Sequence, residues 1–294
     1  MKSEKNFYLF LPNIVFLYYN VQVILFNIAE TYEEGVVIML KYVASDLDGT
    51  LLRNGAQSLN SEVFELILKL KEKGIRFIAA SGRQYDNLYR LFGPVQDDIS
   101  YIAENGSLCI HNHKVVSRGL IDRELGLRII KEAKKYSDFH CLLSCESTAY
   151  TDSTDPRFLD HMHNVIKYKI EEVPSLLSIK EPFLKLAVLD FRGTAETERI
   201  FKERFSSEIK VVTSGNLWID FIAPNANKGS GLYDITKHLG IPLKDGIAFG
   251  DQFNDIELLK MAGIGYAMSS CAEGVEKYAD RQTESVESVF YSLL

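Results

Sequence analysis

The most constraining feature of the sequence is an acidic motif that directly follows a short apolar run. Residues 40–45 are apolar enough to predict a buried strand, and DLDGTLL follows at 46–52. In an extended chain Asp46 and Asp48 point the same way, so we expect both carboxylates to share one spot at the end of this strand. Gly49 lets the chain turn sharply after them. Because ligands of open α/β sheets bind at this edge, the motif is a candidate active site.

Strand and helix patterns alternate from residue 39 onward. Apolar residues recur at helical spacing after Asn60, and Gly74 ends the pattern. Further buried strands are expected at 75–80, 99–103, 246–249 and 264–267, helices at 228–239 and 255–261, and amphipathic segments at 272–279 and 285–294. This order predicts an α/β fold with a doubly wound, Rossmann-like parallel sheet.

The middle of the chain has a different pattern. Two long helices are expected at 123–136 and 194–205, and strands at 139–144, 183–191, 211–213 and 218–222. Long helices with strands of mixed pattern indicate an α+β unit. We therefore expect residues 39–118 plus 223–294 to form the core and residues 119–222 to form an inserted cap domain.

Residues 1–38 do not match this alternation. The stretch 7–29 carries no formal charge and is long enough for a membrane span, but Pro12 and several amides interrupt it. Met39 directly precedes the first strand, and Glu33-Glu34-Gly35 use purine-rich codons that can spell a bacterial ribosome-binding site. We expect Met39 to be the true start and 1–38 to be translated leader; a membrane anchor and a packed extra segment are the alternatives.

Charge and cysteine content restrict the class of partner. The net charge is −7 and the pI is near 5.5, which argues against a nucleic-acid partner but leaves room for a local basic pocket. No two of the four cysteines form a C-x-x-C pair, a usage typical of reduced thiols in a cytoplasmic protein. We expect a cytoplasmic location and no membrane contact unless 7–29 is an anchor. The oligomeric state stays open.

Three further motifs are expected at the same edge of the sheet. They are ASGR at 80–83, Lys228 at a helix start, and GDQFND at 250–255. A hydroxyl and a backbone N–H beside a glycine can hold a phosphoryl oxygen. Carboxylates and a phosphate repel one another by about 4 kcal/mol per close charge pair at an effective dielectric of 20, so a cation is needed between them. Mg²⁺ suits such oxygen ligands, and Lys228 adds a second positive charge.

The residue types suggest a role for each carboxylate of the first motif. Asp46 can attack phosphorus without a base, and Asp48 can give a proton to the leaving alkoxide and later accept one from water. The sequence has no P-loop and no G-x-S-x-G elbow, which argues against P-loop ATPases and serine hydrolases. A metal or substrate role for His161 and His163 stays open, whereas Trp218 is expected in the core.

Taken together, these motifs resemble the haloacid dehalogenase superfamily, specifically the Cof-type phosphatases with a large α/β cap. DLDGTLL, ASGR, ENG at 104–106, NKG at 227–229 and GDQFND are similar to that family's motifs. The resemblance implies Asp46 as nucleophile, Asp48 as acid/base, and Mg²⁺ held by Asp46, Asp251 and the main-chain carbonyl of Asp48. It implies further roles for the following residues: Ser81, Gly82, Lys228 and Asn254 in phosphate binding, and Thr50, Arg83 and Asp255 in support.

The implied activity is hydrolysis of small phosphate monoesters through an aspartyl-phosphate, with sugar phosphates as the expected substrates and residues 119–222 closing over them. A phosphatase for pyridoxal phosphate or flavin mononucleotide is the alternative within this class. A phosphomutase, or a regulator that binds a phosphorylated ligand without catalysis, is the alternative from another class.

Overall fold

The computed structural model describes residues 40–146, 148–214 and 216–294. The expectations for residues 1–38 lie outside the described residues. Within the described part of the chain, none of the helices combines the length and the apolar character that a membrane crossing requires.

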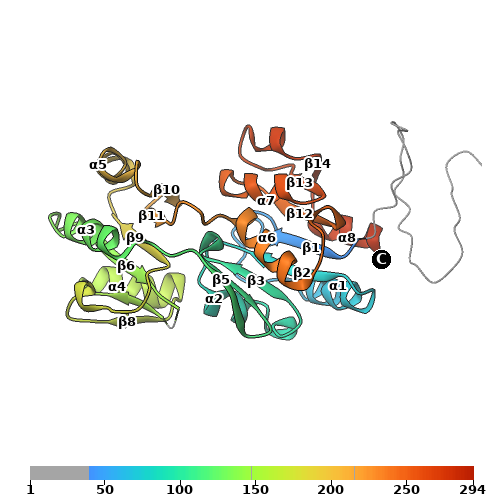
Figure 1. The fold of residues 1–294 in the computed structure, drawn as a ribbon, viewed down its shortest axis with the longest axis horizontal. Coiled ribbons are helices and arrows are strands. Elements are labelled where there is room, and N and C mark those ends of the chain that lie inside the picture. Colours follow the sequence, from blue (N-terminus) through green and yellow to red (C-terminus); the bar gives the residue numbers. More distant parts are fainter. Residues whose placement is uncertain (1–39, 147, 215) are drawn as a thin grey trace, which may run out of the picture.

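The core is built on an eight-stranded sheet with the order β14-β13-β12-β1-β2-β3-β4-β5 (Figure 1). The strands β14, β13, β12, β1, β2 and β3 are mutually parallel, and β4 and β5 continue the sheet antiparallel. Their bounds are β1 Tyr42–Asp46, β2 Arg76–Ala80, β3 Ser100–Ala103, β4 Leu108–His111, β5 Lys114–Arg118, β12 Gly246–Gly250, β13 Ile264–Met268 and β14 Arg281–Thr283. The expected Rossmann-like parallel sheet is confirmed, with an antiparallel hairpin added at one edge.

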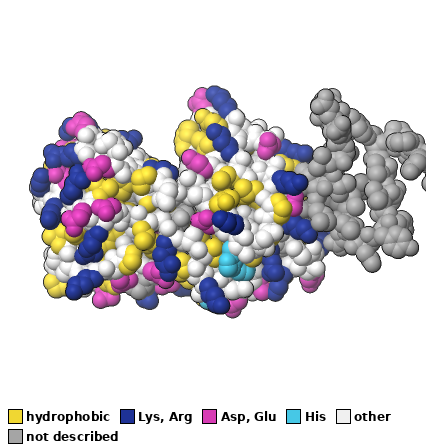
Figure 2. All heavy atoms as spheres, viewed as in Figure 1, with side chains coloured by type: hydrophobic (Ala, Val, Ile, Leu, Met, Phe, Trp, Pro, Cys, Tyr) yellow, Lys and Arg dark blue, Asp and Glu magenta, His cyan; other side chains and the backbone are white. Residues whose placement is uncertain are grey.

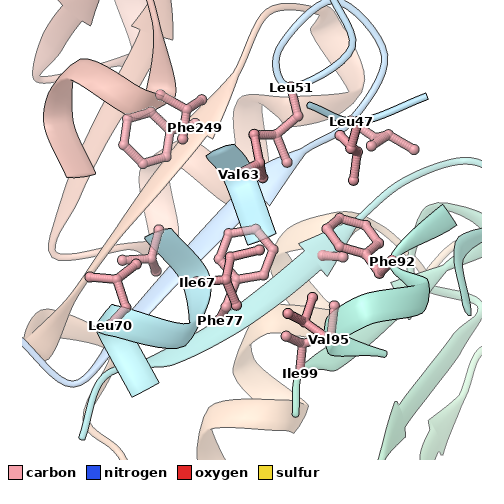
Figure 3. Close-up of a cluster of buried hydrophobic side chains, with 14 of the residues drawn as sticks. Leu47, Leu51, Val63, Ile67, Leu70, Phe77, Phe92, Val95, Ile99 and Phe249 are labelled. Carbon is pink, nitrogen blue, oxygen red and sulfur yellow. The ribbon is translucent and has the colours of Figure 1, made fainter. Parts of the chain in front are cut away.

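Helices cover both faces of this sheet. The helices are α1 Ser61–Glu72, α2 Tyr85–Leu91 and α8 Val286–Leu293 on one face, and α6 Lys228–Leu239 and α7 Ile256–Met261 on the other. The apolar face of α1 packs with Phe77 and Phe249 of the sheet (Figure 3). Asn60 caps α1 by accepting a hydrogen bond from the backbone N–H of Glu62, which is where the sequence predicts the helix to begin.

The cap contains a second, six-stranded sheet with the order β10-β11-β9-β6-β7-β8. Its strands are β6 His140–Ser144, β7 Ala149–Thr151, β8 Ile170–Glu172, β9 Lys185–Leu189, β10 Lys210–Ser214 and β11 Trp218–Ile222. Its helices are α3 Arg123–Ala133, α4 Pro156–Asp160 and α5 Ala195–Phe205, with a π-helix η3 at His161–Ile166. Side chains from α3 and α5 pack on one face of this sheet and form the apolar interior of the cap. The α+β character expected for this part of the chain is confirmed.

The chain passes between core and cap twice, and the two crossings run side by side. Residues 119–122 leave the core after β5, and residues 223–227 return from β11 to α6. A Cβ atom on Gly119 would lie 2.6 Å from the Cβ of Ala226, so the crossings touch. The arrangement is that of one lobe inserted into another (Figure 1). The boundaries at 118/119 and 222/223 stay predictions.

Several short elements differ from the sequence-based expectation. The strands β7, β8 and β14 have three residues each, which is too short to show the apolar run or the alternation that predicts a strand. In addition, β8 lies largely exposed. The helices α2 and α4 are also short. The remaining short helices are η1 Gly93–Val95, η2 Glu104–Gly106, η4 Leu176–Ser178, η5 Leu243–Asp245, η6 Phe253–Asp255 and η7 Val275–Tyr278.

Phe249→Ala tests the packing beneath the carboxyl ends of the parallel strands. Phe249 is 0 % exposed, and its ring lies 5.1 Å from that of Tyr266 and 6.2 Å from that of Phe290. We expect the free energy of unfolding, measured by denaturant titration with circular dichroism, to fall by about 3–5 kcal/mol because a large cavity is left.

The matched control is Phe253→Ala, four residues further along the chain. Phe253 is 59 % exposed, so its truncation should change the free energy of unfolding by less than about 0.5 kcal/mol. Equal losses in the two variants would contradict the assigned packing.

Candidate active site

The sheet brings the ends of three adjacent strands together. β1 pairs in parallel with β12 on one side and with β2 on the other. Asp46 ends β1, Asp251 follows β12, and Ser81 follows β2. Because parallel strands end at the same edge, motifs separated by as many as two hundred residues meet there, as the sequence predicts.

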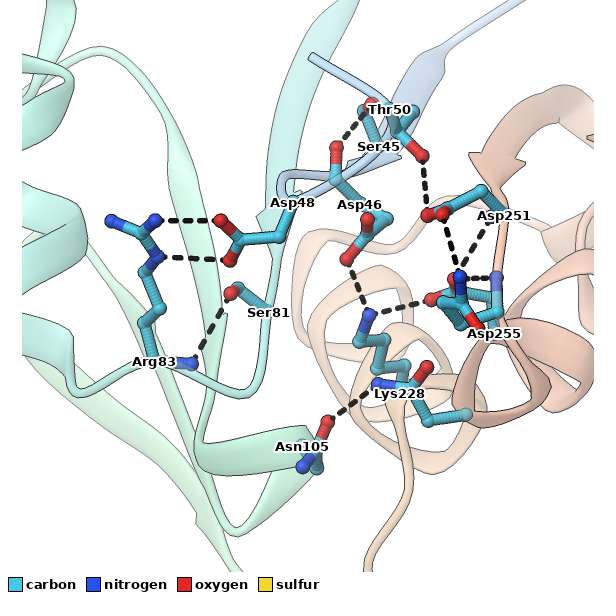
Figure 4. A network of polar contacts seen from close by, with 12 residues as sticks. Ser45, Asp46, Asp48, Thr50, Ser81, Arg83, Asn105, Lys228, Asp251 and Asp255 are labelled. Carbon is cyan, nitrogen blue, oxygen red and sulfur yellow. Dashed lines mark hydrogen bonds and ion pairs between the residues drawn. The ribbon is translucent and has the colours of Figure 1, made fainter. Parts of the chain in front are cut away.

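Lys228 is the buried centre of the site. It is 1 % exposed, and its Nζ donates to Oδ1 of Asp46 and to Oδ1 of Asp255, each at 2.5 Å (Figure 4). Lys228 is the first residue of α6, where Asn227 and Ser230 form reciprocal capping hydrogen bonds. These capping hydrogen bonds fix the residue at which α6 begins and therefore the position of the Lys228 ammonium.

Asp251 and Asp255 are held by a second set of hydrogen bonds. Oδ2 of Asp255 accepts the backbone N–H groups of Asp251 and Gln252, each at 3.0 Å. Asp251 in turn accepts hydrogen bonds from the Thr50 hydroxyl and the Gln252 amide, each at 3.1 Å. Thr50 and Asp255 thus orient the acidic residues, in keeping with the supporting role expected for them.

The carboxylates of this group are more numerous than its cations. Oxygens of Asp46, Asp251 and Asp255 lie within 4.8 Å of one another, and Lys228 is the ammonium bonded to two of the three. Burial, followed by repulsion from Asp255, raises the pKa of Asp46 well above its usual value, and Lys228 only partly opposes this. Burial and Asp255 also raise the pKa of Asp251. A further positive charge would favour the ionised forms.

The donor set of this cluster fits a hard divalent cation. Oδ2 of Asp46 is buried and accepts no hydrogen bond within the described part of the chain. Both oxygens of Asp255 are engaged by Lys228 and by backbone N–H groups, and those of Asp251 accept only neutral side-chain donors, so Asp46 and Asp251 are the residues less committed to a charged partner or to the backbone. Clustered carboxylate oxygens are the ligands that Mg²⁺ prefers.

Asp48 does not lie where the extended-strand argument places it. Its carboxylate is exposed and forms a two-pronged ion pair with Arg83, at 2.8 Å to Nε and 2.6 Å to Nη2, whereas the carboxylate of Asp46 points to Lys228 (Figure 4). Both side chains line the same cavity, but they bind different partners, and Asp48 is exposed whereas Asp46 is buried. β1 ends at Asp46, so the two-residue alternation of a strand does not extend to Asp48.

The expected phosphate-binding residues face the same opening. The backbone N–H of Ser81 donates to the Ile102 carbonyl at 2.8 Å, and the Ser81 hydroxyl oxygen accepts a hydrogen bond from the backbone N–H of Arg83 at 3.2 Å, so the hydroxyl can still donate its hydrogen to a ligand. Asn254 is exposed, and its side-chain amide donates to Oδ1 of Asn105 at 3.1 Å. Asn105 belongs to the ENG motif at 104–106, and this contact places the motif beside Asn254.

A cavity of about 1080 Å³ joins this group to the cap. The core contributes Asp46, Asp48, Ser81, Lys228 and Asn254 to its wall, and the cap contributes Tyr168, Lys185, Trp218 and Asp220. Charged side chains of both signs crowd the outer end of the cap, whereas hydrophobic ones gather nearer the junction of the lobes (Figure 2).

The cap residues on this wall are the part of the site that sequence reasoning missed. Trp218 was expected in the core, yet it is only partly buried and lines the cavity. The signal that could have identified it is the alternation in WIDFI at 218–222, which places Trp218 and Asp220 on one face of a strand.

His161 and His163 belong to the π-helix of the cap. His161 stacks on Trp218 with ring centroids 6.5 Å apart, and burial lowers its pKa. Among the described residues, the cluster of possible metal ligands is the one at Asp46, so the structure gives no support to a metal site at these histidines.

With this geometry in hand, the chain can be compared with known proteins. A family model described as haloacid dehalogenase-like hydrolase matches residues 43–290, and the chain belongs to this family. It is 26 % identical over 237 residues to the Escherichia coli protein 5-amino-6-(5-phospho-D-ribitylamino)uracil phosphatase YbjI, across 80 % of this chain and 88 % of that protein. It is 26 % identical over 236 residues to HMP-PP phosphatase of Cronobacter sakazakii, across 79 % of this chain and 85 % of that protein.

A solved structure supports the same fold. A protein of Streptococcus mutans is 27 % identical and superposes with a TM-score of 0.75, across 86 % of this chain and 98 % of that one. The prediction of a haloacid dehalogenase-type phosphatase with a Rossmann-like core and a cap is therefore confirmed. The metal, the roles of the site residues and the substrate stay predictions.

Gly49→Ala tests the close approach of the first motif to Asp251. A Cβ atom at this position would lie 2.2 Å from Oδ2 of Asp251, and the φ of +93° already disfavours any side chain. We expect phosphate release in a steady-state assay to fall about a hundredfold, because Asp251 must move by a substantial fraction of an ångström.

Gly74→Ala is the matched control for Gly49→Ala. Gly74 also has a positive φ, +77°, but a Cβ atom there meets nothing within 4 Å. This variant should lose stability through backbone strain and keep its activity. Full activity in Gly49→Ala would show that Asp251 need not stay in place.

Proposed function

We propose that this enzyme is a Mg²⁺-dependent phosphatase that hydrolyses small phosphate monoesters, with sugar phosphates as the expected substrates, through an aspartyl-phosphate on Asp46. The observation that carries the proposal is the buried network of Asp46, Lys228, Asp251 and Asp255, which opens into a cavity large enough for a phosphorylated metabolite.

Asp46, Asp251 and the main-chain carbonyl of Asp48 are the groups that would hold the metal. Bound Mg²⁺ would neutralise charge on the phosphate and on the carboxylates that face it. Lys228 contributes a positive charge that the chain itself supplies, and its hydrogen bonds to Asp46 and Asp255 fix the position of the Asp46 carboxylate.

The chemistry needs two displacements at phosphorus. In the first, an Asp46 oxygen bonds to phosphorus while the bond to the alcohol oxygen breaks, and Asp48 gives that oxygen a proton. In the second, water attacks phosphorus and gives a proton to Asp48, and the bond to Asp46 breaks to release inorganic phosphate. Ser81, Gly82 and Asn254 orient the phosphoryl oxygens through both steps.

Asp48 must leave Arg83 to act on the substrate. The pair is partly exposed, and exposed ion pairs contribute only about 0–1 kcal/mol, so separation costs little. Arg83 would then be free to bind the phosphate or the alcohol part of the substrate, in line with the supporting role expected for it.

The cap decides which alcohol is accepted. Its residues form the wall opposite Asp46, and in closing over the substrate they would exclude water. A second candidate function, hydrolysis of pyridoxal phosphate or flavin mononucleotide, is favoured by the side chains of Trp218 and Tyr168 in this wall, since flat rings can stack on them. The substrate named for the Escherichia coli relative also combines a sugar-derived chain with a ring.

The cysteines agree with a cytoplasmic setting. All four are unpaired, and burial raises the pKa of the Cys109, Cys141 and Cys145 thiols, which makes these three unreactive. We therefore place the enzyme, together with its small phosphorylated substrates, in a reducing compartment.

Asp46→Asn tests the nucleophile. The side chain keeps its shape but cannot form an acyl phosphate, so phosphate release from a panel of sugar phosphates, pyridoxal phosphate and flavin mononucleotide should fall at least about a thousandfold. Circular dichroism should show an unchanged fold. The control is Asp98→Asn, which removes an exposed carboxylate paired with Lys71 and should leave turnover unaltered. Turnover retained in Asp46→Asn would refute the nucleophile assignment.

A further inference from the structure

One face of the cap sheet forms the wall of the cavity, and the strand β11 supplies a carboxylate to it. Ile219 and Phe221 point into the apolar interior of the cap. The intervening residues Trp218, Asp220 and Ile222 line the cavity instead. Asp220 is therefore an acidic residue in the middle of an otherwise apolar strand, on the side that faces the substrate space.

The neighbours of Asp220 on this face do not satisfy its carboxylate. Asp220 lies opposite Ala187 on β9 and opposite Val212 on β10, and neither of these side chains can donate a hydrogen bond. Lys185 is the ammonium nearest to it, 3.8 Å from Oδ2, which is longer than a hydrogen bond. Among the described residues, Lys185 is the one cation paired with Asp220 within 4 Å, and its contact is a long one.

Lys185 is already engaged by the core. Its Nζ pairs with Glu104 and donates to the carbonyl of Gly82 at 3.2 Å. One ammonium thus serves two buried carboxylates, and it lies closer to Glu104. Asp220 is only 4 % exposed, and the part of its surface that stays open faces the cavity.

A buried carboxylate with too few donors points to a donor that arrives with the ligand. Burial raises the pKa of Asp220, which agrees with incomplete compensation. The cavity wall that holds Asp220 also holds Asp46 and Ser81, so a phosphate ester seated at Asp46 extends its alcohol part into the same space. The lysines at 185, 202 and 210 on this wall disfavour a cationic donor, so a neutral hydroxyl is the donor that fits beside Asp220.

We infer that Asp220 is a specificity-determining residue that accepts hydrogen bonds from hydroxyl groups on the alcohol part of the substrate. This inference rests on the proposed phosphatase function and names the cap residue that selects a polyol or sugar phosphate. Trp218, two residues earlier on the same face, adds an apolar wall beside the acceptor, and binding sites commonly combine such a wall with a few polar groups.

The test compares two esters of equal carbon number, sorbitol 6-phosphate and n-hexyl phosphate, which differ in their hydroxyl groups. With the wild-type enzyme, kcat/KM should be at least about tenfold higher for sorbitol 6-phosphate. In Asp220→Ala, kcat/KM for sorbitol 6-phosphate should fall about ten- to a hundredfold, the range expected for a lost hydrogen bond to a charged acceptor. Turnover of n-hexyl phosphate should stay within about threefold of wild type in the same variant, since that ester does not engage Asp220.

Two further variants separate specificity from folding. Asp220→Asn keeps the size of the side chain and should reduce the preference for sorbitol 6-phosphate less than Asp220→Ala does. Asp152→Asn changes another buried cap carboxylate, paired with Lys134 and absent from the cavity wall, and should leave the preference unchanged.

The outcomes distinguish this inference from the function on which it rests. An unchanged sorbitol-to-hexyl ratio in Asp220→Asn and Asp220→Ala, with n-hexyl phosphate still hydrolysed, would overturn the role of Asp220 and leave the phosphatase proposal standing. Absence of phosphate release from every ester with the wild-type enzyme would overturn both.

Discussion

The ion pair network around Lys228 is the constraint on which the rest of the site depends. A fully buried ammonium is tolerated only when carboxylates surround it, and here Asp46 and Asp255 do so at 2.5 Å each. The network joins β1, the start of α6 and the segment after β12, so the three elements must meet at one point. Removing the Lys228 ammonium would leave buried carboxylates uncompensated, at a cost of about 3–5 kcal/mol.

The same network fits the proposed binding of a cation and a phosphate. Lys228 is shared between Asp46 and Asp255, Asp251 adds a third carboxylate, and Asp46 keeps one oxygen without a hydrogen bond among the described residues. The excess of negative charge over positive charge in this network leaves a place for the positive charge of the proposed metal ion. The cap contains a similar arrangement, because the ammonium of Lys185 is shared between the carboxylates of Glu104 and Asp220.

The core fold could be predicted from sequence because its strands are buried on both faces. Such strands are continuous apolar runs, and the polar motifs at their ends mark one edge of the sheet. The short strands β7, β8 and β14 carry no comparable pattern. Their positions follow from pairing with neighbours, which a local pattern does not encode.

The candidate site was predictable where the position of a residue along a strand or helix determines which way its side chain points. It was not predictable where tertiary contacts determine the orientation of the side chain. Asp46, Asp251, Asp255 and Lys228 come together as the motifs suggest. The orientation of Asp48 toward Arg83 depends on a turn that breaks the strand alternation. The wall formed by Trp218 and Asp220 depends on how the cap sheet is placed over the core, and no single motif in the cap indicates it.

The central claim, that Asp46 and Asp251 hold a divalent cation beside Lys228, is tested most directly by anomalous scattering from crystals soaked in Mn²⁺, which prefers the same oxygen ligands as Mg²⁺. The account predicts one strong peak within about 2.5 Å of a carboxylate oxygen from each of Asp46 and Asp251. A fully soaked crystal with no peak there, or with its strongest peak elsewhere, would contradict it.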